Sequence, residues 1–190
     1  MTRSRKIAIA VVFGTVGIIC ALAASLWLVG RGGDVATAPH PVWTEMQWPF
    51  PIDEWGKGKA FQCRASDCGT EVNIYVRAKI GFCNCSTGVA DDAELERLSD
   101  FNLVGGQVAA RGDGRPIVVG WMNGRSRFYE ISGSAWGGKA ALSAAFNDGC
   151  DAIVASAILN HKRLVEIEPH VIKFLNNKTV LEWAKVTLGL

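Results

Sequence analysis

The chain has 190 residues, with 20 Lys and Arg against 18 Asp and Glu, a formal net charge of +2, and 49% hydrophobic residues. Three of the basic residues, Arg3, Arg5 and Lys6, precede the first apolar stretch, so the residues beyond it carry 17 basic against 18 acidic side chains. This balance lacks the basic surplus of proteins that bind nucleic acid or strongly anionic membranes. We therefore expect no nucleic acid as a partner.

Residues 7–29 carry no charge. As a helix they would reach about 35 Å, enough to cross a hydrocarbon core of about 30 Å. We predict a cytoplasmic basic tail (1–6) and a transmembrane anchor (7–29) in the bacterial inner membrane, because positive charges before a span hold that end in the cytoplasm. The rest would face the periplasm. A cleaved signal peptide is the alternative, since Ala21, Leu22 and Ala23 satisfy the small-x-small rule; the apolar residues 25–29 after them favour a retained anchor.

Small residues recur on one face of this predicted span, at Gly14, Gly17 and Ala21. Small side chains let a second helix approach closely in lipid, where packing drives helix association. The stripe indicates contact with the span of a partner membrane protein or of a second copy. The alternative is that small residues are simply frequent in exported N-terminal segments.

Residues 30–59 are rich in proline and glycine, which predicts a linker that stays out of helices and sheet ladders. Four large aromatic residues interrupt it: Trp43, Trp48, Phe50 and Trp55. They either pack on the following domain as an extended strap, or rest at the membrane surface. The sharper hypothesis is that they form a peptide that docks a partner protein.

Residues 60–190 are long enough for one domain with a single core. Residues 70–82 alternate between apolar and polar side chains, which predicts a half-buried antiparallel strand. Residues 117–121 and 127–131 flank Asn123-Gly124, a dipeptide typical of tight hairpin turns. A second predicted hairpin joins 140–146 to 152–159 through residues 147–149, with helix as the alternative for these alanine-rich segments.

Two helical regions accompany the strands. Asp91, with Glu94 three residues later, predicts a capped helix that ends near Leu98. Pro169 suits the first position of a C-terminal helix, with a break at residues 176–177. The predicted fold is α+β: an antiparallel sheet of about five strands with helices on one face.

The cysteines carry the chemistry of this domain. Cys63 and Cys68 precede the long strand, whereas Cys83 and Cys85 end it. Residues two apart on a strand share a face, so Cys83 and Cys85 are poorly placed to bond each other, and Cys63 and Cys68 could supply both partners. In an oxidising compartment we expect structural disulfides among these four, with a connectivity that spacing does not determine.

Two alternatives use the same four thiols. Tetrahedral sulfur ligation would suit zinc, and soft thiolates also suit Cu(I). A redox activity has less support, because no Cys-x-x-Cys opens a helix to lower a thiol pKa. Without a metal, no cofactor is expected.

Three segments resemble single-span membrane proteins of alphaproteobacteria: residues 48–56, residues 80–85 and the ending 174–190. The resemblance implies an inner-membrane, periplasm-facing location, and it implies no activity and no catalytic residue.

No acid, base and nucleophile converge in the sequence, so we expect a protein that is not an enzyme. The anchor and the aromatic segment favour an accessory or assembly factor that binds a membrane-protein partner or forms a homodimer. The alternative is a thiol-redox or metal-delivery protein that uses the four cysteines.

Overall fold

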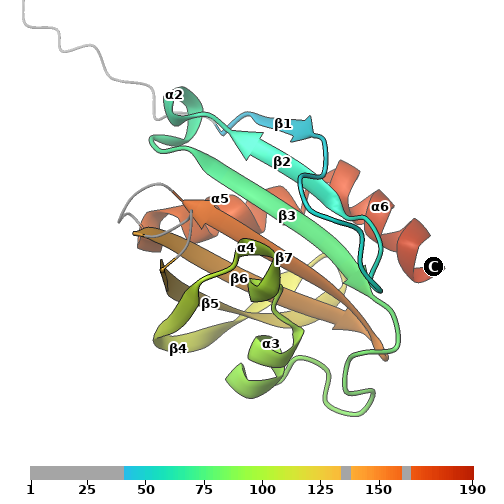
Figure 1. The fold of residues 1–190 in the computed structure, drawn as a ribbon. Coiled ribbons are helices and arrows are strands. Elements are labelled where there is room, and N and C mark those ends of the chain that lie inside the picture. The colour runs from blue at the N-terminus through green and yellow to red at the C-terminus, as the bar shows by residue number, and fades with distance from the viewer. Residues whose placement is uncertain (1–40, 134–137, 160–163) are drawn as a thin grey trace, which may run out of the picture. The chain divides into compact units, whose positions relative to one another are not determined.

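A seven-stranded antiparallel sheet forms the centre of the computed structural model, which describes residues 41–133, 138–159 and 164–190 (Figure 1). The spatial order of the strands is β1-β2-β3-β7-β6-β5-β4. Their bounds are β1 (Trp43–Met46), β2 (Lys59–Cys63), β3 (Val72–Lys79), β4 (Gln107–Val119), β5 (Met122–Ser132), β6 (Lys139–Asp148) and β7 (Asp151–Leu159). The predicted antiparallel sheet is confirmed, with two more strands than expected.

One of the added strands comes from the predicted linker. Trp43 pairs with Cys63 and Met46 with Ala60, so β1 is an edge strand beside β2. The prediction that residues 30–59 stay out of sheet ladders is therefore wrong for this part. The prolines and glycines flank residues 43–46 without interrupting them, which leaves four residues free to pair.

Strand β3 is buried on both faces. Its apolar residues Val72, Ile74 and Val76 are fully buried, and the polar face is covered too, with Arg77 1% and Lys79 5% exposed. The prediction of a half-buried strand is wrong, because a second layer of structure covers the face that carries the polar side chains.

Both predicted hairpins exist, but the first turn lies at a different dipeptide and the second is shifted toward the C-terminus. Val119 pairs with Met122, so Gly120 and Trp121 form the β4–β5 turn, whereas Asn123 and Gly124 lie inside β5. Gly120 has φ of 60° and no non-glycine residue of the described part has positive φ, which is the pattern of a type II′ turn.

The second hairpin turns at Gly149 and Cys150, between the paired residues Asp148 and Asp151. Residues 140–146 and 152–159 are strands, so the helical alternative is wrong.

Helices cover both faces of the sheet: α2 (Ala65–Cys68), α3 (Asp92–Leu98), α4 (Phe101–Val104), α5 (Leu164–Leu175) and α6 (Lys178–Leu188). Figure 1 shows α5 and α6 on one face and α3 and α4 on the other. The core follows this division: Val171 and Val180 pack with Ile74 on one side, whereas Leu95 and Leu98 pack with Val154 on the other. The prediction of helices on one face is wrong.

The ends of the helices were predicted in part. Asp91 caps α3 by accepting a hydrogen bond from the Glu94 backbone N–H, as expected. Helix α5 ends at Leu175, and Asn177 caps α6 through the Val180 N–H, which confirms the break. Pro169 lies inside α5, five residues after its first residue, so its placement at a helix start is wrong.

The predicted tail and anchor, with Gly14, Gly17 and Ala21, lie outside the described residues. Among the residues that the structure does describe, no helix is both long and apolar enough to cross a membrane.

Candidate functional site

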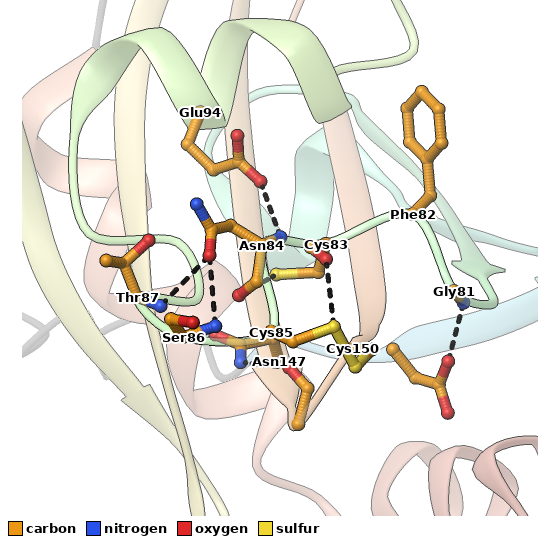
Figure 2. Close-up of a disulfide and its surroundings, with 12 residues drawn as sticks. Gly81, Phe82, Cys83, Asn84, Cys85, Ser86, Thr87, Glu94, Asn147 and Cys150 are labelled. Carbon is orange, nitrogen blue, oxygen red and sulfur yellow. Dashed lines mark hydrogen bonds between the residues drawn. A yellow bond between two sulfur atoms is a disulfide. The ribbon is translucent and has the colours of Figure 1, made fainter.

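Three cysteines meet where the segment after β3 passes the β6–β7 turn (Figure 2). Cys85 forms a disulfide with Cys150, and their Cα atoms are 4.2 Å apart. Cys83 is a free thiol and is buried, the only free cysteine in the described part of the chain. Its backbone N–H donates to the Cys150 carbonyl oxygen at 2.9 Å, so both Cys83 and Cys85 lie against Cys150.

Side chains from both segments fix this contact. Asp151 accepts a hydrogen bond from the Gly81 N–H at 2.6 Å, which holds the turn after β3 against the start of β7. Between the two cysteines, the Asn84 side chain accepts from the N–H groups of Ser86 and Thr87 at 3.0 and 3.2 Å (Figure 2). This Asx turn reverses the chain directly after the cysteine pair.

Helix α3 holds the same segment from the other side. Glu94 accepts a hydrogen bond from the Asn84 N–H at 3.1 Å and pairs with Arg97 at 2.6 Å. Arg97 donates to the Phe82 carbonyl oxygen, and its guanidinium lies 4.4 Å from the centre of the Phe82 ring. We call Glu94 and Arg97 the α3 clamp. The clamp forms hydrogen bonds with the two peptide groups that flank Cys83.

The Cys83 side chain lies in an apolar cluster with Val89, Leu95, Leu98 and Val154, and the residue is 6% exposed. Burial raises the pKa of the Cys83 thiol, and the neighbouring Glu94 carboxylate raises it further against the opposing effect of Arg97. A buried thiol with a raised pKa is held in its unreactive, protonated form. In this conformation Cys83 is not a nucleophile.

The other two predicted cysteines bond each other. Cys63 at the end of β2 and Cys68 at the end of α2 form a disulfide with Cα atoms 6.0 Å apart. The pairing of Cys63 and Cys68 with Cys83 and Cys85, one of the connectivities that spacing left open, does not occur. The alternating strand ends at Lys79 and a turn follows, so Cys83 and Cys85 are carried to the opposite end of β3 from Cys63.

The four thiols therefore do not meet as a zinc or copper site. In the described ranges, no group of three or more His, Cys, Asp or Glu side chains is arranged to hold a metal ion. Sequence reasoning also missed Cys150, whose position in a tight turn gave no sign of its partner.

The four predicted docking aromatics pack on the domain. Trp43 lies 4.5 Å from the Phe174 ring of α5, and Trp55 lies 4.7 Å from Phe82. Phe50 lies 4.7 Å from Tyr75 of β3, and Trp48 lies 5.3 Å from Phe50. All four are half-buried, as the strap alternative predicts. These rings are engaged within the chain.

Buried charged side chains also hold residues 43–55, which we call the aromatic strap, on the domain. The sequence analysis did not predict these charged contacts. Arg77 makes two hydrogen bonds to Asp100, at 2.6 and 2.7 Å, and a bidentate contact to Asp53 at 2.7 and 2.8 Å. Lys79 lies 2.9 Å from Asp100. Two cations and two carboxylates thus neutralise each other under the strap, which gives them a structural role.

An apolar groove on the other face was also missed. It has a volume of about 110 Å³ and lies between β2–β3 and α6, lined by Lys59, Phe61, Val76, Thr179, Val180 and Trp183. Val186, one turn beyond Trp183 on the same helix face, is 80% exposed. We call the groove together with the exposed Val186 side chain the α6 surface.

These features define a class of protein: a disulfide-stapled α+β domain built on one antiparallel sheet. No protein-family model, no curated protein and no solved structure matches the chain.

Proposed function

We propose that the protein is a membrane-anchored accessory factor whose domain faces the periplasm and binds a partner membrane protein through the α6 surface. The α6 surface carries this proposal. Thr179, Trp183 and Val186 recur at the i, i+4, i+7 spacing of one helix face, and the groove beside them is lined mainly by apolar atoms. A mainly apolar groove with an exposed apolar side chain on the same helix is typical of sites that receive an apolar segment of another protein.

The location rests on independent features. The uncharged stretch 7–29 after Arg3, Arg5 and Lys6 supports an anchor with the domain outside the cytoplasm. Two disulfides support an oxidising compartment, because cytosolic thiols are kept reduced. The aromatic segment, which the sequence favoured as the docking candidate, packs on its own domain, so the α6 surface is the stronger candidate.

Site-specific photo-crosslinking in native membranes tests this function. A benzophenone amino acid at Val186 should give one discrete product with a membrane protein, whereas the same probe at the exposed Asp113 of β4, on the far edge of the sheet, should not. Thr179→Asp in the Val186 probe background should abolish the product by placing a charge in the groove. This variant should still fold, because an acidic residue suits the first turn of a helix.

A product that persists with Thr179→Asp, or that forms equally from position 113, would contradict binding through the α6 surface. A product between two copies of this chain would instead indicate a homodimer and contradict binding of a partner membrane protein through the α6 surface.

A further inference from the structure

The position of Cys150 offers it two disulfide partners. It is bonded to Cys85, and its carbonyl oxygen accepts the Cys83 N–H at 2.9 Å. This hydrogen bond holds the Cys83 backbone directly beside the Cys150 backbone. The Cys85 Sγ atom itself lies 4.0 Å from the Cys83 carbonyl oxygen. The three cysteines thus form one cluster in which only one pair is bonded (Figure 2).

We propose that this cluster is a thiol–disulfide exchange site, in which Cys150 transfers its bond from Cys85 to Cys83 and Cys85 is released as an exposed thiol. Cys83 gives its proton to solvent, and its thiolate forms a bond to the Sγ atom of Cys150. The Cys85–Cys150 bond breaks, and Cys85 leaves with the electron pair and takes up a proton. One disulfide is lost and one is formed, so the step needs no oxidant or reductant.

The two bonded states differ in what they present to solvent. In the structure the free thiol is Cys83, which is 6% exposed, whereas Cys85 is an exposed residue. Exchange therefore replaces a buried thiol with an accessible one. A released Cys85 thiolate can attack a disulfide of another molecule, whereas Cys83 in its apolar cluster cannot be reached.

The α3 clamp controls the exchange. Glu94 and Arg97 hold the peptide groups on either side of Cys83, and Leu95 and Leu98 of the same helix cover its side chain. Charged groups that act on Cys83 are Glu94 and Arg97 of α3 and Asp151 of β7. With the clamp closed, burial disfavours the thiolate; loosening α3 exposes Cys83 and lets its side chain turn toward Cys150.

Alkylation of the folded, unreduced protein tests the exchange. The protein is incubated with N-ethylmaleimide at pH 7 and pH 8, quenched in acid, and mapped by peptide mass spectrometry without reduction. We expect the label on Cys85 together with a Cys83–Cys150 peptide. The labelling rate should rise about tenfold over this pH unit, because the thiolate fraction of a high-pKa thiol rises tenfold per unit. A label on Cys83 with Cys85–Cys150 intact would overturn the proposal, since it would show only the opening of a buried thiol.

Two variants separate exchange from unfolding. Glu94→Gln with Arg97→Gln should accelerate labelling at Cys85, whereas Glu182→Gln with Lys185→Gln, a matched pair on α6, should not. Cys83→Ser should abolish the label on Cys85. An unchanged rate in the clamp variant, or Cys85 labelling in Cys83→Ser, would overturn the proposal.

Cys85→Ser provides a measurement that does not depend on kinetics. After air oxidation it should contain a Cys83–Cys150 disulfide beside Cys63–Cys68 and show no free thiol among these four cysteines. If Cys83 and Cys150 remain reduced while Cys63–Cys68 and the circular dichroism spectrum are those of the parent, the two residues cannot bond and the proposal fails.

Discussion

Arg77 and Asp100, which are 23 residues apart in the sequence, are joined by two parallel hydrogen bonds of 2.6 and 2.7 Å in the interior of the domain. The Arg77 side chain is 1% and the Asp100 side chain 4% exposed. The pair connects β3 to the start of α4, and Asp53 extends it to the aromatic strap. Burial opposes the charge of Arg77, but the hydrogen bonds to Asp100 and Asp53 outweigh it and raise the pKa of the guanidinium. Arg77 therefore stays ionised in the interior.

Replacing Arg77 tests how much the fold depends on this pair. Arg77→Met should lower the free energy of unfolding by about 3 kcal/mol, because removing one partner leaves a buried charge uncompensated. This loss is at the low end of the range for broken buried ion pairs, because Lys79 still contacts Asp100. Urea unfolding measures it.

Arg111→Met is the matched control. Arg111 pairs with Glu130, and both side chains are more than half exposed. The change should cost less than about 1 kcal/mol. Equal effects of the two substitutions would contradict the structural importance of the buried pair.

Acid should weaken the strap through Asp53. The hydrogen bond from Arg77 is the largest cause that holds the pKa of the Asp53 carboxyl below its ordinary value, and it outweighs burial. Because the folded state then binds fewer protons than the unfolded state, the contribution of Asp53 to stability is complete well above pH 4 and is lost as the pH falls through the lowered folded pKa.

Asp53→Asn should therefore be less stable than the parent by about 1.5 kcal/mol at pH 6, and the difference should be smaller at about pH 3. Urea unfolding at both pH values measures it, with the exposed neighbour Glu54→Gln as the control. A difference that is constant with pH would contradict the ionic role of Asp53.

Local signals in the sequence predicted local structure well. Asp91 and Glu94 lie on one turn of helix, so the cap of α3 could be predicted from their spacing alone. The alternation around Ile74 predicted strand β3 for the same reason. The burial of Arg77 could not be predicted, because the residues that cover it, Asp53 and Asp100, come from segments on either side in the sequence.

The cysteine site shows the same limit. Spacing indicated that Cys83 and Cys85 do not bond each other, which the structure bears out. Their surroundings depend on the β6–β7 turn, 65 residues beyond Cys85, and nothing near Cys150 indicates that this turn packs against Cys85. Long-range register, which fixes this contact, is not encoded in any short pattern.

The two disulfides should differ in their contribution to stability. In the chain-entropy relation, the constraint on the unfolded state grows with the length of the closed loop. For sequence separations of 5 and 65 residues, it gives about 2 kcal/mol for Cys63–Cys68 and about 4 kcal/mol for Cys85–Cys150.

The double variants Cys63→Ser with Cys68→Ser and Cys85→Ser with Cys150→Ser test this order by urea unfolding. Cys83→Ser in both backgrounds ensures that a disulfide to Cys83 does not contribute to the difference in stability. A larger loss from the short loop would show that native packing around α2, and not loop length, sets the contribution.

The position of the β4–β5 turn is where the observed hairpin differs from the predicted one. Gly120 has φ of 60°, where a non-glycine residue is strained, and a Cβ atom there would lie 2.9 Å from the Leu181 side chain. Gly120→Ala should therefore lower the free energy of unfolding by about 1 to 3 kcal/mol.

Asn123 is an exposed residue of β5 that pairs with Val118, so Asn123→Thr should leave stability unchanged within about 0.5 kcal/mol or raise it slightly. If Asn123 and Gly124 formed the turn instead, a β-branched residue at position 123 would meet the positive φ that such turns require and would be the more damaging change. Thermal unfolding of the two variants distinguishes these arrangements, and a greater loss for Asn123→Thr than for Gly120→Ala would contradict the observed register.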